Sequence, residues 1–284
     1  MKFQKMHGLG NDFILFDEIN PLSFDLSALA VRLCDRRQGI GADGIVLILP
    51  SEIADVKMRI INSDGSEANM CGNGIRCFAK YVYDKHIKED KSFTIETGAG
   101  VMIPELLVEQ GKVLFVKVNM GAPVLDRPLI PMIGPSGHVI DEPLLVGGKE
   151  LKITSLLMGV PHTIIFVDNL EDIDIVAIGR EVETHPSFPK KTNVNFVEVI
   201  NDHEINVRTW ERGAGATLAC GTGSCASAVA SCLNGRTGPN VTVHLALGDL
   251  QIEWLDGVVF MTGSADHVFE GELEPGSYEL TGIK

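Results

Sequence analysis

The chain has 284 residues, of which 45% are hydrophobic and 22% are charged. This composition is typical of a globular protein, and the length allows two modest domains. The formal net charge of −14 argues against a nucleic-acid partner or an anionic membrane surface, because both recruit basic patches. No apolar run reaches the roughly 20 residues of a membrane span. We therefore expect a cytoplasmic protein that binds a small molecule.

Six cysteines are too few for a disulfide framework in a chain of this length, so we expect reduced thiols. The closest pairs, Cys71 with Cys77 and Cys220 with Cys225, do not have Cys-x-x-Cys spacing. No His-rich segment follows them. The sequence thus predicts no metal site.

Hydrophobic patterns in the first half predict strands, then a helix, then further strands. The strands before the helix are expected at 13–17, 45–49 and 59–62. The helix begins after Cys71, where apolar residues recur at i, i+3, i+4 and i+7 from Ile75. The strands after it are expected at 94–96, 101–108 and 113–119.

The second half repeats this order at an offset of about 150 residues. Its strands are expected at 164–168, 196–200 and 208–211, and after a helix that follows Cys220, at 242–247, 250–254 and 258–261. This alignment sets Asn11 opposite His162 and Asn62 opposite Glu211. The Pro- and Gly-rich segment 120–148 is expected to be a linker with an irregular excursion.

The repeat predicts an α+β fold with two pseudo-symmetric domains that arose by internal duplication. Each domain is expected to be a curved mixed β-sheet or barrel around a central helix. The N-terminal domain would comprise residues 1–117 and 266–284, and the C-terminal domain residues 118–265. We expect the active site in the cleft between them, where ligand sites often form.

Two matching segments, Met70-Cys71-Gly72-Asn73-Gly74 and Ala219-Cys220-Gly221-Thr222-Gly223, open the two helices. A thiol at a helix N-terminus is favoured as thiolate by the dipole and the free N–H groups. Two bases on opposite faces of a carbon can invert it, since one removes the proton and the other delivers one. The helix-start N–H groups suit a substrate carboxylate.

Four segments resemble the signature motifs of the diaminopimelate epimerase family, and the resemblance covers nearly the whole chain. They are residues 5–13, 62–67, 71–77 and 211–223. The resemblance implies cofactor-independent interconversion of LL- and meso-diaminopimelate, a step in the synthesis of lysine and peptidoglycan precursors. It also implies that Cys71 and Cys220 are the catalytic bases, and that the protein is a homodimer.

The same resemblance implies roles for the residues around the two thiols. Gly72, Asn73, Gly221 and Thr222 would hold the carboxylate at the reacting centre, and His162 and Glu211 would tune the thiols. Substrate binding would fall to Asn11, Asn62, Asn193, Glu211 and Arg212, with Arg212 able to pair with the distal carboxylate through two hydrogen bonds.

One position departs from the family pattern. The usual Gly-Asn-Pro-His sequence appears here as Gly159-Val160-Pro161-His162. Val160 replaces a substrate-contacting Asn with a side chain that forms no hydrogen bond. The departure concerns recognition of the distal end of the substrate, because both Cys-Gly-x-Gly segments are intact.

Three alternatives remain open at this point. A related two-thiol racemase with another amino-acid substrate would use the same reacting centre. The segment 221–226 fits the G-x-G-x-x-A dinucleotide pattern, although no strand leads directly into it. A pyridoxal-phosphate racemase needs a lysine for its Schiff base, and the expected site contains none.

Overall fold

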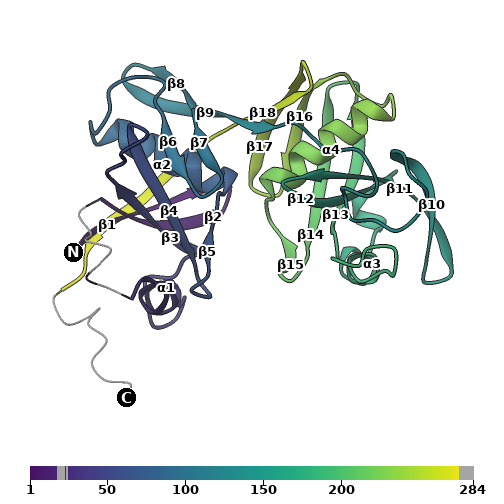
Figure 1. The fold of residues 1–284 in the computed structure, drawn as a ribbon, viewed down its shortest axis with the longest axis horizontal. Helices are drawn as coiled ribbons and strands as arrows, with labels where there is room; N and C mark the ends of the chain where they lie inside the picture. Colours follow the sequence, from purple (N-terminus) through teal and green to yellow (C-terminus); the bar gives the residue numbers. More distant parts are fainter. Residues whose placement is uncertain (18–22, 24, 275–284) are drawn as a thin grey trace. The chain divides into compact units, whose positions relative to one another are not determined.

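The computed structural model describes residues 1–17, 23 and 25–274. The chain divides into two compact units (Figure 1). Unit 1 comprises Met1–Val118 and Gly263–Lys284, and unit 2 comprises Asn119–Thr262. Within the described residues, no helix is both long and apolar enough to cross a membrane.

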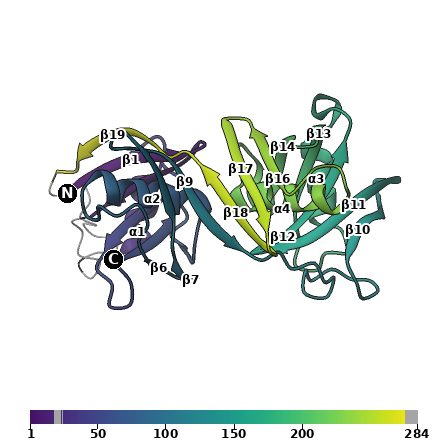
Figure 2. The ribbon, with the colours of Figure 1, turned by 90° about the horizontal axis from the view of Figure 1, so that it is seen from above.

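A mixed sheet forms the body of unit 1, in the order β19-β1-β2-β3-β4-β6-β7, with β5 paired to β4. β1 and β19 are antiparallel neighbours, as Figure 2 shows, whereas β2 and β3 are parallel. β8 and β9 pair antiparallel as a hairpin. The strands are β1 (Lys2–Gly8), β2 (Asn11–Phe16), β3 (Gly44–Leu49), β4 (Val56–Asn62), β5 (Glu67–Ala68), β6 (Ile95–Thr97), β7 (Gly100–Met102), β8 (Glu105–Glu109), β9 (Lys112–Gly121) and β19 (Asp266–Glu272).

Two helices of unit 1 pack on this sheet. α1 (Leu26–Cys34) buries Leu29 and Leu33 in a cluster with Phe16 and other strand residues. α2 (Gly72–Asp84) packs against β1 to β4, and Phe13 lies beside its first turn. Because helices contact both faces, β3 is a nearly continuous apolar run without polar alternation.

Unit 2 has a corresponding sheet in the order β10-β11-β12-β13-β14-β16-β17-β18, with β15 paired to β14. The strands are β10 (Val139–Val146), β11 (Lys149–Met158), β12 (Val160–Val167), β13 (Asn193–Asn201), β14 (Glu204–Glu211), β15 (Gly215–Thr217), β16 (Asn240–Leu245), β17 (Gly248–Leu255) and β18 (Val258–Gly263). α3 (Ile175–Glu183) follows a short 3-10 turn, η2 (Leu170–Asp172). α4 (Gly221–Leu233) contacts β11 to β14 as well as β16 and β17, so the sheet curves around it (Figure 1).

The central helix α4 is built from small residues, which lets the strands approach closely. Its three serines, Ser224, Ser227 and Ser231, are all buried. Each hydroxyl donates to the carbonyl oxygen four residues earlier. These bonds satisfy the polar groups within the helix itself, so they can lie in the core.

The duplication is visible in the pairing of the strands. An offset of 149 residues relates α1 to α3 and α2 to α4 over their whole lengths. The same offset relates the pairs Phe13↔Gly44 and His162↔Asn193. It also holds where β4 meets β5 and β14 meets β15. The expected architecture of two pseudo-symmetric domains, each a curved mixed sheet around a helix, is confirmed.

The register corrects part of the alignment made from sequence. Because the offset is 149, Asn11 corresponds to Val160, and His162 corresponds to Phe13. The sequence alignment had used 151 for these strands. A shift of two residues keeps every side chain on its own face of the sheet, so hydrophobic patterning cannot detect it.

Two smaller expectations were also wrong. The segment 101–108 forms parts of two strands, β7 and β8, because Pro104 has no N–H to continue the ladder. The segment 120–148 is not entirely irregular, since β10 occupies its last third and pairs with β11.

Candidate functional site

Cys71 and Cys220 are the N-cap residues of α2 and α4. Both have extended backbone, with φ and ψ of −141° and 123° at Cys71 and −131° and 109° at Cys220. Each sulfur accepts a hydrogen bond of 3.4 Å from the N–H three residues later, in Gly74 and Gly223. The expected position of both thiols at helix starts is confirmed.

In unit 1, Asn11 connects β2 to the start of α2. Its Oδ1 accepts from Cys71 Sγ at 3.5 Å and from Asn73 Nδ2 at 3.2 Å. Its Nδ2 donates to Asp43 Oδ2 at 2.7 Å. Asn73 is buried, and its Oδ1 has no hydrogen-bond partner among the residues that the structure describes. Three of the residues expected at the site are thus in mutual contact.

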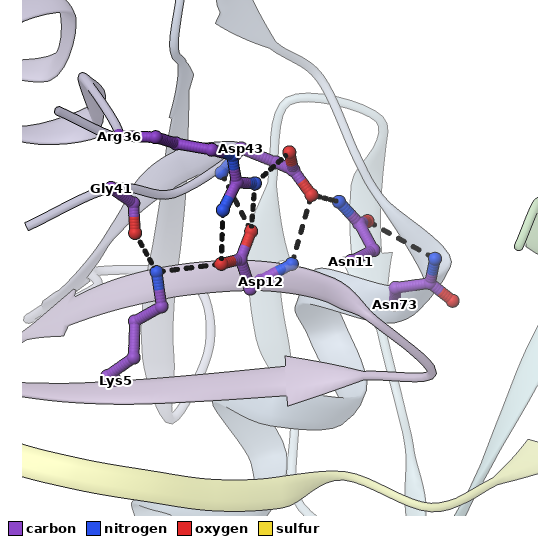
Figure 3. A network of polar contacts seen from close by, with 7 residues as sticks. All are labelled: Lys5, Asn11, Asp12, Arg36, Gly41, Asp43 and Asn73. Carbon is purple, nitrogen blue, oxygen red and sulfur yellow. Dashed lines mark hydrogen bonds and ion pairs between the residues drawn. The ribbon is translucent and has the colours of Figure 1, made fainter. Parts of the chain in front are cut away.

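An ionic network lies behind Asn11 (Figure 3). Arg36 donates to both carboxylate oxygens of Asp12 and to Asp43 Oδ1. Lys5 is buried and contacts Asp12 Oδ2 at 2.8 Å and the carbonyl oxygen of Gly41. Burial would raise the pKa of Asp12, but the bonds to Arg36 and Lys5 outweigh it and lower the pKa to about 2.

Sequence reasoning missed Arg36 and Asp43. Neither belongs to a quoted motif, and both lie in the segment between α1 and β3. The available signal was a Gly-rich stretch at 39–44 that contains Asp43 and comes shortly after Arg36. Lys5 and Asp12 were within a motif but had been given no role.

In unit 2, a buried polar chain leads to Cys220. Thr222 Oγ1 is 3.5 Å from Cys220 Sγ, and His162 Nε2 is 3.1 Å from Thr222 Oγ1. On the other side of the ring, His162 Nδ1 is 3.1 Å from Asn195 Nδ2, and Thr209 donates to Asn195 Oδ1. Asn195 and Thr209 were not anticipated, because each is one residue within an otherwise ordinary strand.

His162 is fully buried within this chain. Burial, with a further contribution from the positive charge of Arg212, lowers its pKa to about 3. The imidazole is therefore neutral near pH 7, when it can donate from one ring nitrogen and accept at the other.

The Cys220 thiol differs from the sequence-based expectation that the helix start favours its thiolate form. Burial is the main cause that raises the pKa of this thiol well above its ordinary value, and the carboxylate of Glu211 adds to it. The hydrogen bonds from Thr222 and Gly223 act in the opposite direction but are weaker. The helix start alone thus does not favour thiolate at Cys220, because desolvation of the charged form outweighs it.

The other residues expected in unit 2 lie at the start of β13, at the end of β14 and directly after β14. Asn193 is buried and accepts the backbone N–H of Arg212 at 2.8 Å. The Arg212 guanidinium donates to the carbonyl oxygen of Lys190 at 3.1 Å. Glu211 accepts from the Thr217 hydroxyl at 2.7 Å. Asn193 therefore positions the chain at Arg212.

The remaining expected residues lie at a turn, at the two helix starts and at the start of a strand. Asn62 donates to the Ser66 hydroxyl at 3.0 Å, across the turn between β4 and β5. Gly72 and Gly221 are the first residues of α2 and α4, and both are buried. Val160 is partly buried at the start of β12. Since it corresponds to Asn11, unit 2 lacks the amide that contacts the thiol in unit 1.

Comparison with known proteins gives the family. The family model described as diaminopimelate epimerase matches residues 3–125 and 154–268. The chain is 56% identical to the diaminopimelate epimerase of Pelotomaculum thermopropionicum, covering 96% of this chain and 98% of the relative. It is 53% identical to that of Moorella thermoacetica, covering 96% and 99%.

A solved structure supports the fold. The chain is similar to a probable proline racemase from Agrobacterium radiobacter, with a TM-score of 0.69 and 16% identity, over 98% of this chain and 94% of that one. At that identity the likeness concerns the fold alone. The family model and the close relatives together place this chain in the diaminopimelate epimerase family of isomerases.

Proposed function

We propose that the protein interconverts LL- and meso-diaminopimelate, with Cys71 and Cys220 as the two acid-base groups. The observation that carries the proposal is that both sulfurs cap equivalent helices of a duplicated fold, each beside a glycine N–H. The names of the relatives give the substrate. The reaction serves the synthesis of lysine and peptidoglycan precursors.

The reaction needs one thiolate and one thiol. The thiolate removes the α-proton from one face of the substrate carbon, and the pair of electrons moves into the adjacent carboxylate. The thiol then delivers its proton to the opposite face, so the two sulfurs exchange protonation states. Backbone N–H groups at the helix starts, around Gly72 and Asn73 and around Gly221 and Thr222, would stabilise the carboxylate as its charge grows.

The residues around the thiols fit supporting roles in this scheme. His162 reaches Cys220 through Thr222, and Glu211 raises the pKa of the same thiol. Asn11, Asn62, Asn193, Glu211 and Arg212 would bind the substrate. Thiol proton transfer requires neither metal nor organic cofactor. We further propose that the protein acts in the cytoplasm, where thiols stay reduced, and that its active form is a homodimer.

Deuterium exchange tests the proposal. In D₂O, the wild-type protein should incorporate deuterium at the α-carbon of LL-diaminopimelate and form the meso isomer. Cys71→Ala and Cys220→Ala should each abolish epimerisation without unfolding the protein. Cys232→Ala, also on α4 but near its other end, is the matched control and should keep full activity. Turnover retained by either of the first two variants would refute the two-base assignment.

A second candidate is a related racemase with a different amino-acid substrate. Val160 favours it, because this position offers no hydrogen bond to the distal end of a substrate. Exchange measured with proline, glutamate and histidine beside diaminopimelate distinguishes the two. Faster exchange into one of these than into diaminopimelate would support the second candidate.

A further inference from the structure

The orientation of one amide in unit 1 is determined by its neighbours. Asn11 Nδ2 lies 2.7 Å from Asp43 Oδ2. An ionised carboxylate can only accept hydrogen bonds, so the amide must present its NH₂ group to Asp43. Its carbonyl oxygen then points toward Asn73 in the first turn of α2 (Figure 3). The same oxygen lies 3.5 Å from Cys71 Sγ.

Asp43 is itself held in place. Its Oδ1 accepts from Arg36 Nη2 at 2.8 Å, and its Oδ2 also accepts the backbone N–H of Asp12 at 3.1 Å. Arg36 forms two further bonds to the Asp12 carboxylate. Both oxygens of Asp43 are therefore occupied, and rotation of its carboxylate would break several charge-assisted bonds.

Unit 2 contains no counterpart of this arrangement. At the offset of 149 residues, Val160 replaces Asn11, Pro161 replaces Asp12 and Thr192 replaces Asp43. The hydroxyl of Thr192 lies instead in a neutral contact with Thr163. The ionic network thus acts at one thiol of the duplicated pair.

We propose that Asp43 is a positioning residue that fixes the Asn11 amide so that its carbonyl oxygen accepts the proton of the Cys71 thiol. The inference rests on the proposed role of Cys71. A hydrogen-bond acceptor at this place stabilises thiol over thiolate, whereas the N–H of Gly74 favours thiolate. The balance of the two contacts therefore contributes to the pH at which Cys71 loses its proton.

Other charged and titratable groups of unit 1 also surround this region. They are Lys5 and His7 on β1, Asp12 on β2, Arg36 and Asp43 before β3, Arg76 and Cys77 on α2, and Asp266 on β19. A change of charge at Asp43 can therefore act on Cys71 through space as well as through Asn11. The experiment must separate these routes.

The test is the rate of alkylation of Cys71 by iodoacetamide across pH, read from its peptide by mass spectrometry. In Asp43→Asn, the Asn11 amide is free to turn its NH₂ toward the sulfur. The pH of half-maximal alkylation should then fall by about one unit, equivalent to about tenfold faster alkylation on the acidic side. Asp35→Asn is the matched control, because this exposed carboxylate bonds only to the backbone of its own turn in the contacts described. It should not shift the midpoint.

A double-mutant cycle with Asn11→Ala separates the two routes. If Asp43 acts through the amide, Asp43→Asn should cause no further shift in the Asn11→Ala background. An equal shift in both backgrounds, or none in either, would overturn the proposal. Should Asp43→Asn not fold by circular dichroism, Asp43→Ser, which also removes the carboxylate that accepts from Asn11, should shift the midpoint in the same direction, and no shift would count against the proposal. Alkylation needs no turnover, so this result is independent of whether diaminopimelate is the substrate.

Discussion

Gly223→Ala should destabilise unit 2 by about 3 kcal/mol. A Cβ at Gly223 would lie 2.5 Å from Asn195 Oδ1 and 3.2 Å from Cys220 Sγ. Asn195 is fully buried and bonded to His162 and Thr209, so it cannot move without losing a bond. An unmade buried hydrogen bond costs about 1–3 kcal/mol and overpacking a similar amount, while the helix preference of Ala returns about 1 kcal/mol.

Gly74→Ala is the matched control at the equivalent position of α2. A Cβ there would lie 3.1 Å from Ile60 Cδ1 and 3.5 Å from the Phe13 ring, both apolar contacts. The end of the Ile60 side chain can shift slightly without breaking a hydrogen bond. The stability of this variant should stay within about 1 kcal/mol of the wild type, because the gain in helix preference offsets the crowding.

Urea denaturation measures both variants. The two tryptophans of the chain, Trp210 and Trp254, lie in unit 2, so their fluorescence reports the unfolding of that unit. Circular dichroism follows the whole chain. Gly223→Ala should also lower kcat/KM more than Gly74→Ala does. It displaces Asn195, and with it the hydrogen-bonded side chains that lead through His162 to Cys220. Equal free energies of unfolding for the two variants would refute the claim that Asn195 cannot move without losing a hydrogen bond.

Three further outcomes are expected. Because the pKa of His162 is about 3 rather than 6.5, the unfolded chain binds a proton below pH 6.5 that the folded one does not. The contribution of neutral His162 to the free energy of unfolding is therefore complete above pH 6.5 and falls by up to about 1.4 kcal/mol per pH unit toward pH 3. His162→Gln should remove this part of the pH dependence, which urea titrations at pH 7.5 and pH 5 measure. Asp12→Asn leaves the buried Lys5 without its carboxylate and should cost about 3 kcal/mol by thermal or urea unfolding, whereas Arg36→Ala, at a side chain 58% exposed, should cost roughly 1 kcal/mol; equal losses would contradict this. Val160→Asn should lower the KM for diaminopimelate about fivefold, as one added hydrogen bond would, with kcat unchanged in steady-state assays; a change confined to kcat would disprove a role in binding.

The sequence by itself determined the duplicated order of elements and the two helix starts. Helix N-caps and their glycines are local features, set by residues within one turn of each other, so Cys71 and Cys220 could be placed without tertiary information. The apolar periodicity of α2 was equally direct, since its core face is a property of the helix alone. The family motifs added the residues proposed to bind the substrate.

Only the tertiary structure decided which residues of the two halves correspond and what surrounds each thiol. Strand register had to come from the pairing of β2 with β3 and of β12 with β13, because a two-residue slip leaves the hydrophobic pattern unchanged. The contact of Asp43 with Asn11 joins residues 32 positions apart, and that of Asn195 with His162 joins residues 33 apart. No local pattern predicts such pairs. Burial, which raises the pKa of Cys220 against the effect of the helix start, is likewise a property of the folded chain alone.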